Sequence, residues 1–141
     1  MQDVPDLREI KLRKTSRLLE IVFDDRRRFE LPFEYLRVFS PSAEVRGHGP
    51  GQEVLQVGKE NVRIDRVEPV GNYAVRLYFD DGHNTGLYTW QYLLELGEHY
   101  DRKWRQYLER LRAAGDVRSA GPPAVPSPGR KGLDSKKSEQ A

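Results

Sequence analysis

The sequence predicts an α+β protein: one compact domain whose antiparallel β-sheet is built from two similar halves, each a β-hairpin followed by a helix, with an amphipathic helix at the C-terminal end. Three observations indicate this fold. Strand-like alternation is interrupted by short Asp-rich turns, the order strand, turn, strand and aromatic-rich helix occurs twice, and a helical periodicity follows. We expect the domain over residues 1–115 and a tail over residues 116–141.

The first half contains three expected strands and one helix. Apolar residues alternate with charged ones, as is typical of half-buried strands, at residues 7–14, 17–23 and 27–31. Asp24 and Asp25 form the turn between the second and third strands. Pro32 stands at the expected first position of a short helix over residues 32–39, where its missing N–H has no intrahelical partner to lose.

The second half is expected to repeat this order, with strands at residues 62–70, 73–79 and 84–88. A helix follows over residues 89–97, with Thr89 as its N-terminal cap and Gly97 as its end. The triplet Phe-Asp-Asp begins at residue 23 and again 56 residues later, and the pair Tyr-Leu at residue 35 and again 57 residues later. These spacings indicate an internal duplication; the alternative is two hairpins that converged on the same turn chemistry.

The last two segments differ in character. Residues 98–115 have the spacing of an amphipathic helix, with an apolar stripe formed by Tyr100, Trp104, Tyr107, Leu108 and Leu111. We expect this stripe to pack on the sheet; the alternative is contact with a partner or a second copy. Residues 116–141 are rich in Pro, Ser, Gly and Lys and bury too little apolar surface to offset chain entropy, so we expect a disordered tail or a Pro-rich ligand segment.

Composition excludes several classes of protein. The 141 residues include no cysteine, which excludes disulfides, thiolate catalysis and cysteine-ligated zinc or iron–sulfur sites built by this chain alone. No apolar run approaches the roughly 20 residues of a membrane span, and the N-terminus lacks the apolar core of a signal peptide. We therefore expect a cytoplasmic protein with no membrane contact. Residues 1–115 carry 19 basic and 19 acidic side chains, so the net charge of +2 lies in the tail, and nucleic-acid binding through the last helix and tail is the least favoured option.

Residues 40–52, which read SPSAEVRGHGPGQ, connect the two halves. Glycines let backbone N–H groups form an anion-holding nest, and Arg46 beside His48 would add a clamp for a carboxylate or phosphate. The hairpin tip of the second half adds Asp81 and His83. If the two loops converge, His48, Asp81 and His83 are a donor set that suits zinc or iron. The alternatives are a connector and an ordinary polar turn.

Two further interpretations concern serine hydrolysis and the stacking of nucleic-acid bases. Ser40 and Ser42 lack the G-x-S-x-G sequence of a nucleophile elbow, so a Ser–His–Asp hydrolase is not expected, and Ser40 is expected to cap a turn or close the helix. Aromatic side chains that could stack nucleic-acid bases are instead expected in the core; they are Tyr73, Tyr88, Trp90 and Tyr92.

The strings SPSAEVRGHGPGQ, EPVGNYAV and FDDGH followed by Y-x-W resemble the gamma-butyrobetaine hydroxylase-like N-terminal domain family, over roughly residues 7–113. The family consists largely of small bacterial proteins of unknown function. The resemblance implies a compact α+β domain built on antiparallel sheet. In gamma-butyrobetaine hydroxylase this domain precedes an iron- and 2-oxoglutarate-dependent catalytic domain. It also occurs fused to nucleotide-binding iron–sulfur carrier proteins, which implies an accessory role in cluster assembly.

The hydroxylase carries a zinc site in this domain, built from Cys-x-Cys-x-x-Cys and a later His. By resemblance these positions correspond to Ser40, Ser42, Val45 and His83. Serine hydroxyls stay protonated at neutral pH and valine has no donor atom, so we expect the zinc site to be lost and no cofactor to be held. Residues after 115 are too few for the catalytic domain, so hydroxylase activity is not expected.

These observations predict a non-catalytic binding or accessory module that contacts a protein partner, in a process linked to iron–sulfur or metal metabolism. The contact surface is expected where the two loops meet, with Arg46, His48, Asp81 and His83 as the binding residues. The alternative is a metal- or small-anion-binding domain that uses His48, Asp81 and His83 as ligands.

Overall fold

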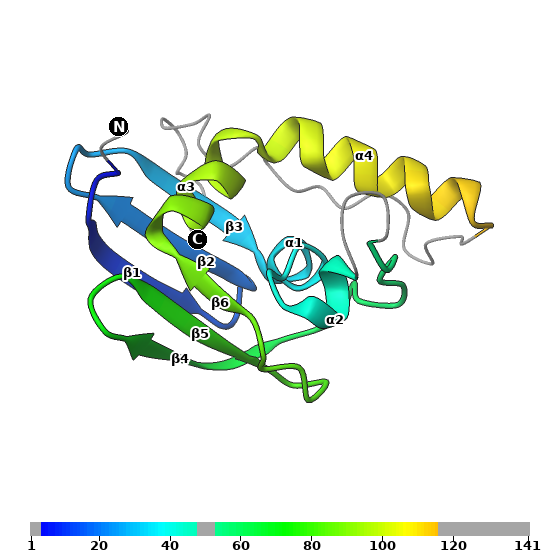
Figure 1. Ribbon diagram of the computed structural model, residues 1–141, viewed down its shortest axis with the longest axis horizontal. Coiled ribbons are helices and arrows are strands. Elements are labelled where there is room, and N and C mark those ends of the chain that lie inside the picture. Colours follow the sequence, from blue (N-terminus) through cyan, green and yellow to red (C-terminus); the bar gives the residue numbers. More distant parts are fainter. Residues whose placement is uncertain (1–3, 48–52, 116–141) are drawn as a thin grey trace.

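The computed structural model describes residues 4–47 and 53–115, which form two three-stranded antiparallel sheets and four helices (Figure 1). The strand orders are β1-β2-β3 and β4-β5-β6, so each half of the chain forms its own sheet. The elements are β1 (Leu7–Arg13), β2 (Leu18–Phe23), β3 (Arg28–Pro32), α1 (Phe33–Val38), α2 (Ala43–Arg46), β4 (Ile64–Val70), β5 (Ala74–Phe79), β6 (Leu87–Thr89), α3 (Trp90–Glu98) and α4 (Tyr100–Ala113). The predicted α+β fold class is confirmed.

The helix boundaries predicted from Pro32 and Gly97 differ from those of the structure. Pro32 does not open α1 but ends β3 and precedes the helix, since its φ of −62° and ψ of 147° are extended. Gly97 does not end α3 but lies inside it, and a single residue, His99, separates α3 from α4. The cap predicted at Thr89 is confirmed, because its side chain accepts a hydrogen bond from the N–H of Tyr92 at 3.1 Å.

The two halves repeat each other in backbone detail. At the hairpin tips the N–H of Phe23 donates to the carbonyl of Arg27, and 56 residues later the N–H of Phe79 donates to the carbonyl of His83. The first two strands of each sheet also pair with a register shift at the same place, near the start of the first strand. The duplication inferred from sequence spacing is therefore present in three dimensions.

Tyrosines at equivalent positions of α1 and α3 join the halves reciprocally. The hydroxyl of Tyr35 donates to the carbonyl oxygen of Leu96 at 2.6 Å. The hydroxyl of Tyr92 donates to the carbonyl oxygen of Phe39, also at 2.6 Å. Each acceptor follows the other half's tyrosine by four residues. This exchange indicates that the halves are related by approximate twofold symmetry.

The core is formed by alternate residues of the strands together with α1 and α3. Side chains exposed by 4% or less include Leu19, Ile21, Phe23, Leu31, Ile64, Leu77, Phe79 and Leu93. The predicted stripe on α4 is buried mainly against α1 rather than on a sheet: Tyr100 packs edge-on to Tyr35, and Tyr107 to Phe39. No helix in the described part of the chain is long and apolar enough to span a membrane.

Candidate functional site

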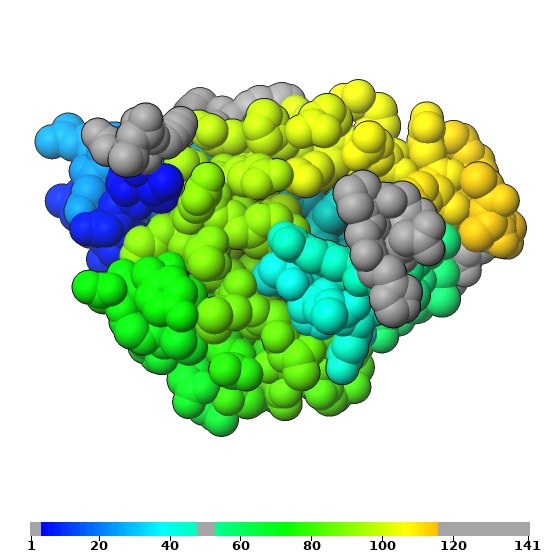
Figure 2. All heavy atoms as spheres, in the orientation of Figure 1, coloured from blue at the N-terminus to red at the C-terminus, as the bar shows by residue number. Residues whose placement is uncertain are grey.

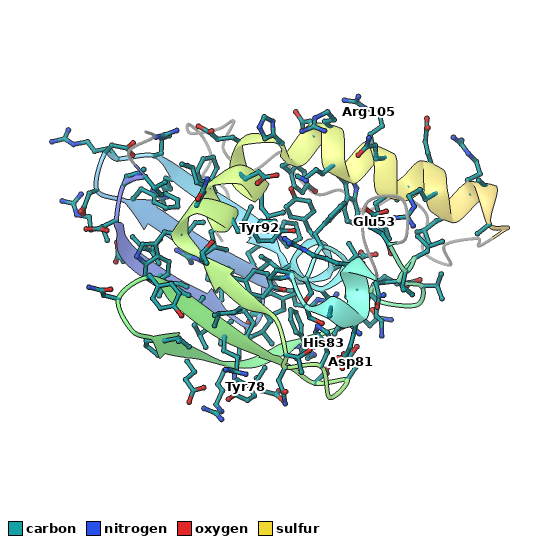
Figure 3. The ribbon with its side chains drawn as sticks, in the orientation of Figure 1. Glu53, Tyr78, Asp81, His83, Tyr92 and Arg105 are labelled. Atoms are coloured by element: carbon teal, nitrogen blue, oxygen red, sulfur yellow. The ribbon has the colours of Figure 1, made fainter. Side chains whose placement is uncertain are left out.

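The connection between α1 and α2 meets the hairpin tip of the second half at His83 (Figure 3). The Nε2 atom of His83 lies 2.8 Å from Oγ of Ser40, and its Nδ1 atom lies 3.1 Å from Oε1 of Glu44. His83 is 7% exposed and Ser40 is 1% exposed. One buried imidazole therefore ties the end of α1 and the first turn of α2 to the hairpin tip.

Helix α2 brings Glu44 beside His83. The Ser42 side chain accepts a hydrogen bond from the N–H of Glu44 at 3.0 Å and so caps the helix. Gly47, whose φ of 72° favours glycine, closes the helix after one turn. The prediction of a connector without helix was incomplete here, because a single turn is too short to show hydrophobic periodicity.

Asp81 stands two residues before His83 and is held by two cations. Its Oδ2 atom accepts hydrogen bonds from Nε of Arg37 at 2.9 Å and Nζ of Lys59 at 2.8 Å, and Oδ1 accepts one from the N–H of His83 at 3.2 Å. Burial opposes ionisation, but the hydrogen bonds from Lys59 and Arg37 outweigh it and lower the pKa of Asp81 to about 2. The carboxylate is ionised and its oxygens are engaged within the protein.

His83 is neutral near pH 7. Burial lowers the pKa of His83, the nearby Arg37 guanidinium lowers it further, and Glu44 and Asp81 only partly oppose this. A neutral imidazole has one N–H, so one ring nitrogen donates and the other accepts. Because the Glu44 carboxylate only accepts, the proton lies on Nδ1, and Nε2 accepts from the Ser40 hydroxyl.

Comparison of the two halves shows what makes room for this cluster. In the first half Phe29 packs on Gly97 so closely that a Cβ at Gly97 would lie within 2.7 Å of three ring atoms. At the equivalent contact of the second half, 57 residues along, Gly86 faces Ser40, and a Cβ at Gly86 would lie less than 3.0 Å from Oγ. The large residue of one contact, Phe29, is a glycine in the other, and Ser40, which is hydrogen-bonded to His83, lies against that glycine.

The hydrogen bonds link Glu44, His83 and Ser40 in the order carboxylate, imidazole, hydroxyl, as in the catalytic triad of a serine hydrolase. Nδ1 faces the carboxylate and Nε2 faces the hydroxyl, as activation of a nucleophile requires. However, Ser40 is 1% exposed, and the backbone of Gly86 lies against its Oγ. An acyl group has no room to approach this hydroxyl, so the three side chains form a structural bridge.

Metal-donor positions are also engaged with protein groups. Within residues 4–47 and 53–115, no three His, Cys, Asp or Glu side chains are grouped to hold a metal ion. Of the donor set considered from the sequence, Asp81 is ion-paired, His83 bridges two side chains, and His48 lies outside the described residues. Of the positions expected by resemblance to match the family zinc site, Ser40 and Ser42 lie on the α1–α2 connection, Val45 lies in α2, and His83 lies on the hairpin tip bonded to Ser40.

A groove opens beside the α1–α2 connection and is lined by α2, α3, α4 and residues 53–56. In Figure 2, α2 (cyan) and α4 (yellow) lie on the same face of the molecule. Its lining includes the aromatic rings of Phe39, Tyr92 and Tyr107. The Arg46 guanidinium carbon lies 5.1 Å from the centre of the Tyr92 ring, and Nζ of Lys103 lies 5.3 Å from the centre of the Phe39 ring. Both distances fall in the range of cation–π attraction.

Among the exposed side chains that line the groove, Val54 and Arg46 offer contacts of opposite character. Val54 is 50% exposed and is one of the three exposed large apolar residues in the described part of the chain. Arg46 is exposed and forms no ion pair with a carboxylate of the described residues. Burial raises the pKa of Tyr92, while the hydrogen bond from Arg46 opposes that rise.

The sequence-predicted binding residues fall into two groups. Arg46 lines the groove, whereas Asp81 and His83 belong to the hydrogen-bonded cluster around His83, in which Ser40 and His83 are buried and Glu44 and Asp81 are exposed. His48 lies outside the described residues. Sequence reasoning missed the partners of these residues, which are Arg37, Glu44, Lys59, Gly86 and Tyr92. One signal was available for Gly86, since alignment of the two halves sets it against Phe29.

Residues 10–94 match the family described as gamma-butyrobetaine hydroxylase-like, N-terminal. The chain belongs to this family. A similar protein, solved by NMR in solution, is 52% identical over 84% of this chain and 88% of its own, with a TM-score of 0.72. A second NMR structure is 45% identical over 88% of this chain and 98% of its own, with a TM-score of 0.71.

A crystal structure from Acidithiobacillus ferrooxidans, described as a protein of unknown function in the DUF971 family, is also similar. It is 41% identical over 67% of this chain and 97% of its own, with a TM-score of 0.56. A search of the curated proteins gives no match. The resemblance inferred from the motifs is therefore confirmed: the region matched in the gamma-butyrobetaine hydroxylase-like family is the N-terminal domain, and it includes both loops of the candidate site.

Proposed function

We propose that this member of the gamma-butyrobetaine hydroxylase-like N-terminal family is a non-catalytic binding module that holds a segment of a protein partner in the groove between α2, α3 and α4. The observation that carries the proposal is Arg46, an exposed guanidinium over the Tyr92 ring that has no carboxylate partner among the described residues. Val54 adds an exposed apolar contact to the same groove.

These contacts define the chemistry of the partner segment. Arg46 suits a carboxylate, because a guanidinium binds both carboxylate oxygens at once. Val54 suits an apolar side chain, because removing apolar surface from water is favourable. A partner segment that carries an acidic residue close to an aliphatic or aromatic one satisfies both.

The hydrogen-bonded cluster around His83 supports this function indirectly. His83 joins Ser40 to Glu44, so it holds α2, the helix that carries Arg46, against the end of α1. A rigid groove loses less entropy on binding than a loop that must first be ordered. We therefore assign Asp81 and His83 to positioning the groove rather than to contacting the partner.

The family resemblance supports a place for this module in iron–sulfur or metal metabolism. In that setting the partner would be the protein that handles the metal, and this domain would dock on it. The donor positions support such a division of labour, because Asp81 and His83 are already committed to Arg37, Lys59, Ser40 and Glu44.

Site-specific photo-cross-linking tests the proposal. A benzophenone amino acid in place of Val54 reports on the groove, and the same amino acid in place of Tyr73 is a matched control, since both residues are 50% exposed and Tyr73 lies at the β4–β5 turn. We expect an adduct with one cellular protein from position 54 that is absent from position 73 and is lost on Arg46→Ala. Identical adducts from both positions, or an adduct that survives Arg46→Ala, would contradict the proposal.

A further inference from the structure

The groove ends where the C-terminal tail begins. Ala113, the last residue of α4, belongs to its lining. The N–H of Gly115 then donates to the carbonyl of Arg112 at 3.0 Å, and Gly115 has a φ of 83°, so the helix closes with a left-handed residue. A left-handed residue after a helix turns the chain off the helix axis. The described part of the chain therefore ends beside the groove, at a residue that turns the backbone off the axis of α4.

The tail contains a segment suited to an aromatic groove. Residues 122–128 read PPAVPSP, which includes the P-x-x-P sequence of residues 123–126. Pro-rich segments favour the polyproline II conformation, which has no internal hydrogen bonds and loses little entropy on docking. Their known binding surfaces are grooves lined by aromatic rings. Here the groove offers the partly exposed rings of Phe39 and Tyr92, whereas Tyr107 is 3% exposed.

The tail is long enough for its Pro-rich segment to reach the groove. The part of the groove along α4 extends from Lys103 to Ala113, a rise of about 15 Å in a helix. Residues 116–126 span about 34 Å in the polyproline II conformation. The P-x-x-P segment can thus fold back over the whole length of this groove.

One carboxylate of the groove, that of Glu53, complements the basic residues that flank the Pro-rich segment. Glu53 is exposed in the groove and forms no ion pair within the described residues; Arg110 donates to its backbone oxygen rather than to its carboxylate (Figure 3). Basic residues stand on both sides of the Pro-rich segment, at Arg118, Arg130 and Lys131. Complementary charge of this kind fixes the register of a docked segment.

We infer that residues 122–128 of the tail dock in the groove of their own chain, over its aromatic rings and beside Glu53. The inference rests on the groove and not on the partner proposed above, so each can fail without the other. If both hold, the tail competes with the partner segment, and binding of the partner displaces it.

Paramagnetic relaxation in NMR tests the inference on the full chain. The protein has no cysteine, so Ser127→Cys gives a single site for a nitroxide label. We expect the label to broaden the amide signal of Val54 and to leave that of Tyr73, equally exposed but at the β4–β5 turn, unchanged. A control carries the same label with Pro123→Gly and Pro126→Gly, which remove the polyproline preference, and there the broadening at Val54 should be lost.

Three outcomes would overturn the inference. The first is equal broadening at Val54 and Tyr73, and the second is broadening at Val54 that survives both Pro→Gly substitutions. The third comes from mixing spin-labelled chains with isotope-labelled chains that carry no spin label. Broadening as strong in that mixture as within one chain would place the tail on a second copy.

Discussion

Gly86→Ala tests whether the Ser40–His83 bridge depends on the missing side chain at residue 86. A Cβ there would lie less than 3.0 Å from Oγ of Ser40 and 3.1 Å from Cδ of Pro41. Overpacking of this kind costs about 1–3 kcal/mol. Ser40→Ala alone should cost a similar amount, about 1–3 kcal/mol, because it leaves Nε2 of His83 buried without a partner.

The double variant separates this contact from general destabilisation. Removing Oγ of Ser40 removes the closest clash, so Gly86→Ala should cost at least about 1 kcal/mol less in the Ser40→Ala background. Urea unfolding followed by tryptophan fluorescence measures the four free energies of unfolding. Gly71→Ala is the control, since a Cβ there meets only Tyr73 and its cost should add to that of Ser40→Ala. Costs for Gly86→Ala that agree within about 0.5 kcal/mol in both backgrounds would refute the reasoning.

Two further predictions concern pH and packing. Burial lowers the pKa of His83, so the unfolded chain takes up a proton at this residue more readily than the folded chain does. The contribution of His83 to the free energy of unfolding is therefore complete above pH 6.5 and is lost as pH falls below that value. Unfolding free energies measured from pH 8 to pH 5 should decline for the wild type and decline less for His83→Gln; equal slopes would contradict this. Gly97→Ala should destabilise the fold by about 1–3 kcal/mol in urea unfolding, although alanine favours a helix by about 1 kcal/mol, because the Phe29 ring occupies the space; a stabilised variant would contradict the packing.

Much of the fold could be predicted from the sequence because the signals are local and repeated. The alternation in β2 puts Leu19, Ile21 and Phe23 on one face, and all three are fully buried. The Phe-Asp-Asp and Tyr-Leu spacings identified a duplication that the backbone hydrogen bonds reproduce. Helix α2 was missed because a single turn held by Ser42 has no period to detect.

The candidate site was predictable only in part, for a physical reason. Sequence patterns identified Asp81 and His83 as polar residues on a hairpin tip, but their roles depend on partners 22 to 44 residues away along the chain. Nothing local indicates that Arg37, inside a short apolar helix, reaches Asp81. The groove is likewise assembled from segments that meet only in the folded chain, and Arg46 was selected for its glycine-rich surroundings rather than for its contact with Tyr92.

The most direct test of the central claim compares two arginines in a binding measurement. Arg46 lies in the groove, whereas Arg105 lies on the outer side of α4, and both are exposed (Figure 3). With the protein captured from position 54, purified and titrated calorimetrically, Arg46→Ala should weaken the Kd at least about tenfold, equal to about 1.4 kcal/mol. Arg105→Ala should leave the Kd within about twofold of the wild type, equal to about 0.4 kcal/mol. Equal losses for both variants, or no loss for Arg46→Ala, would contradict the account of the groove as the binding surface.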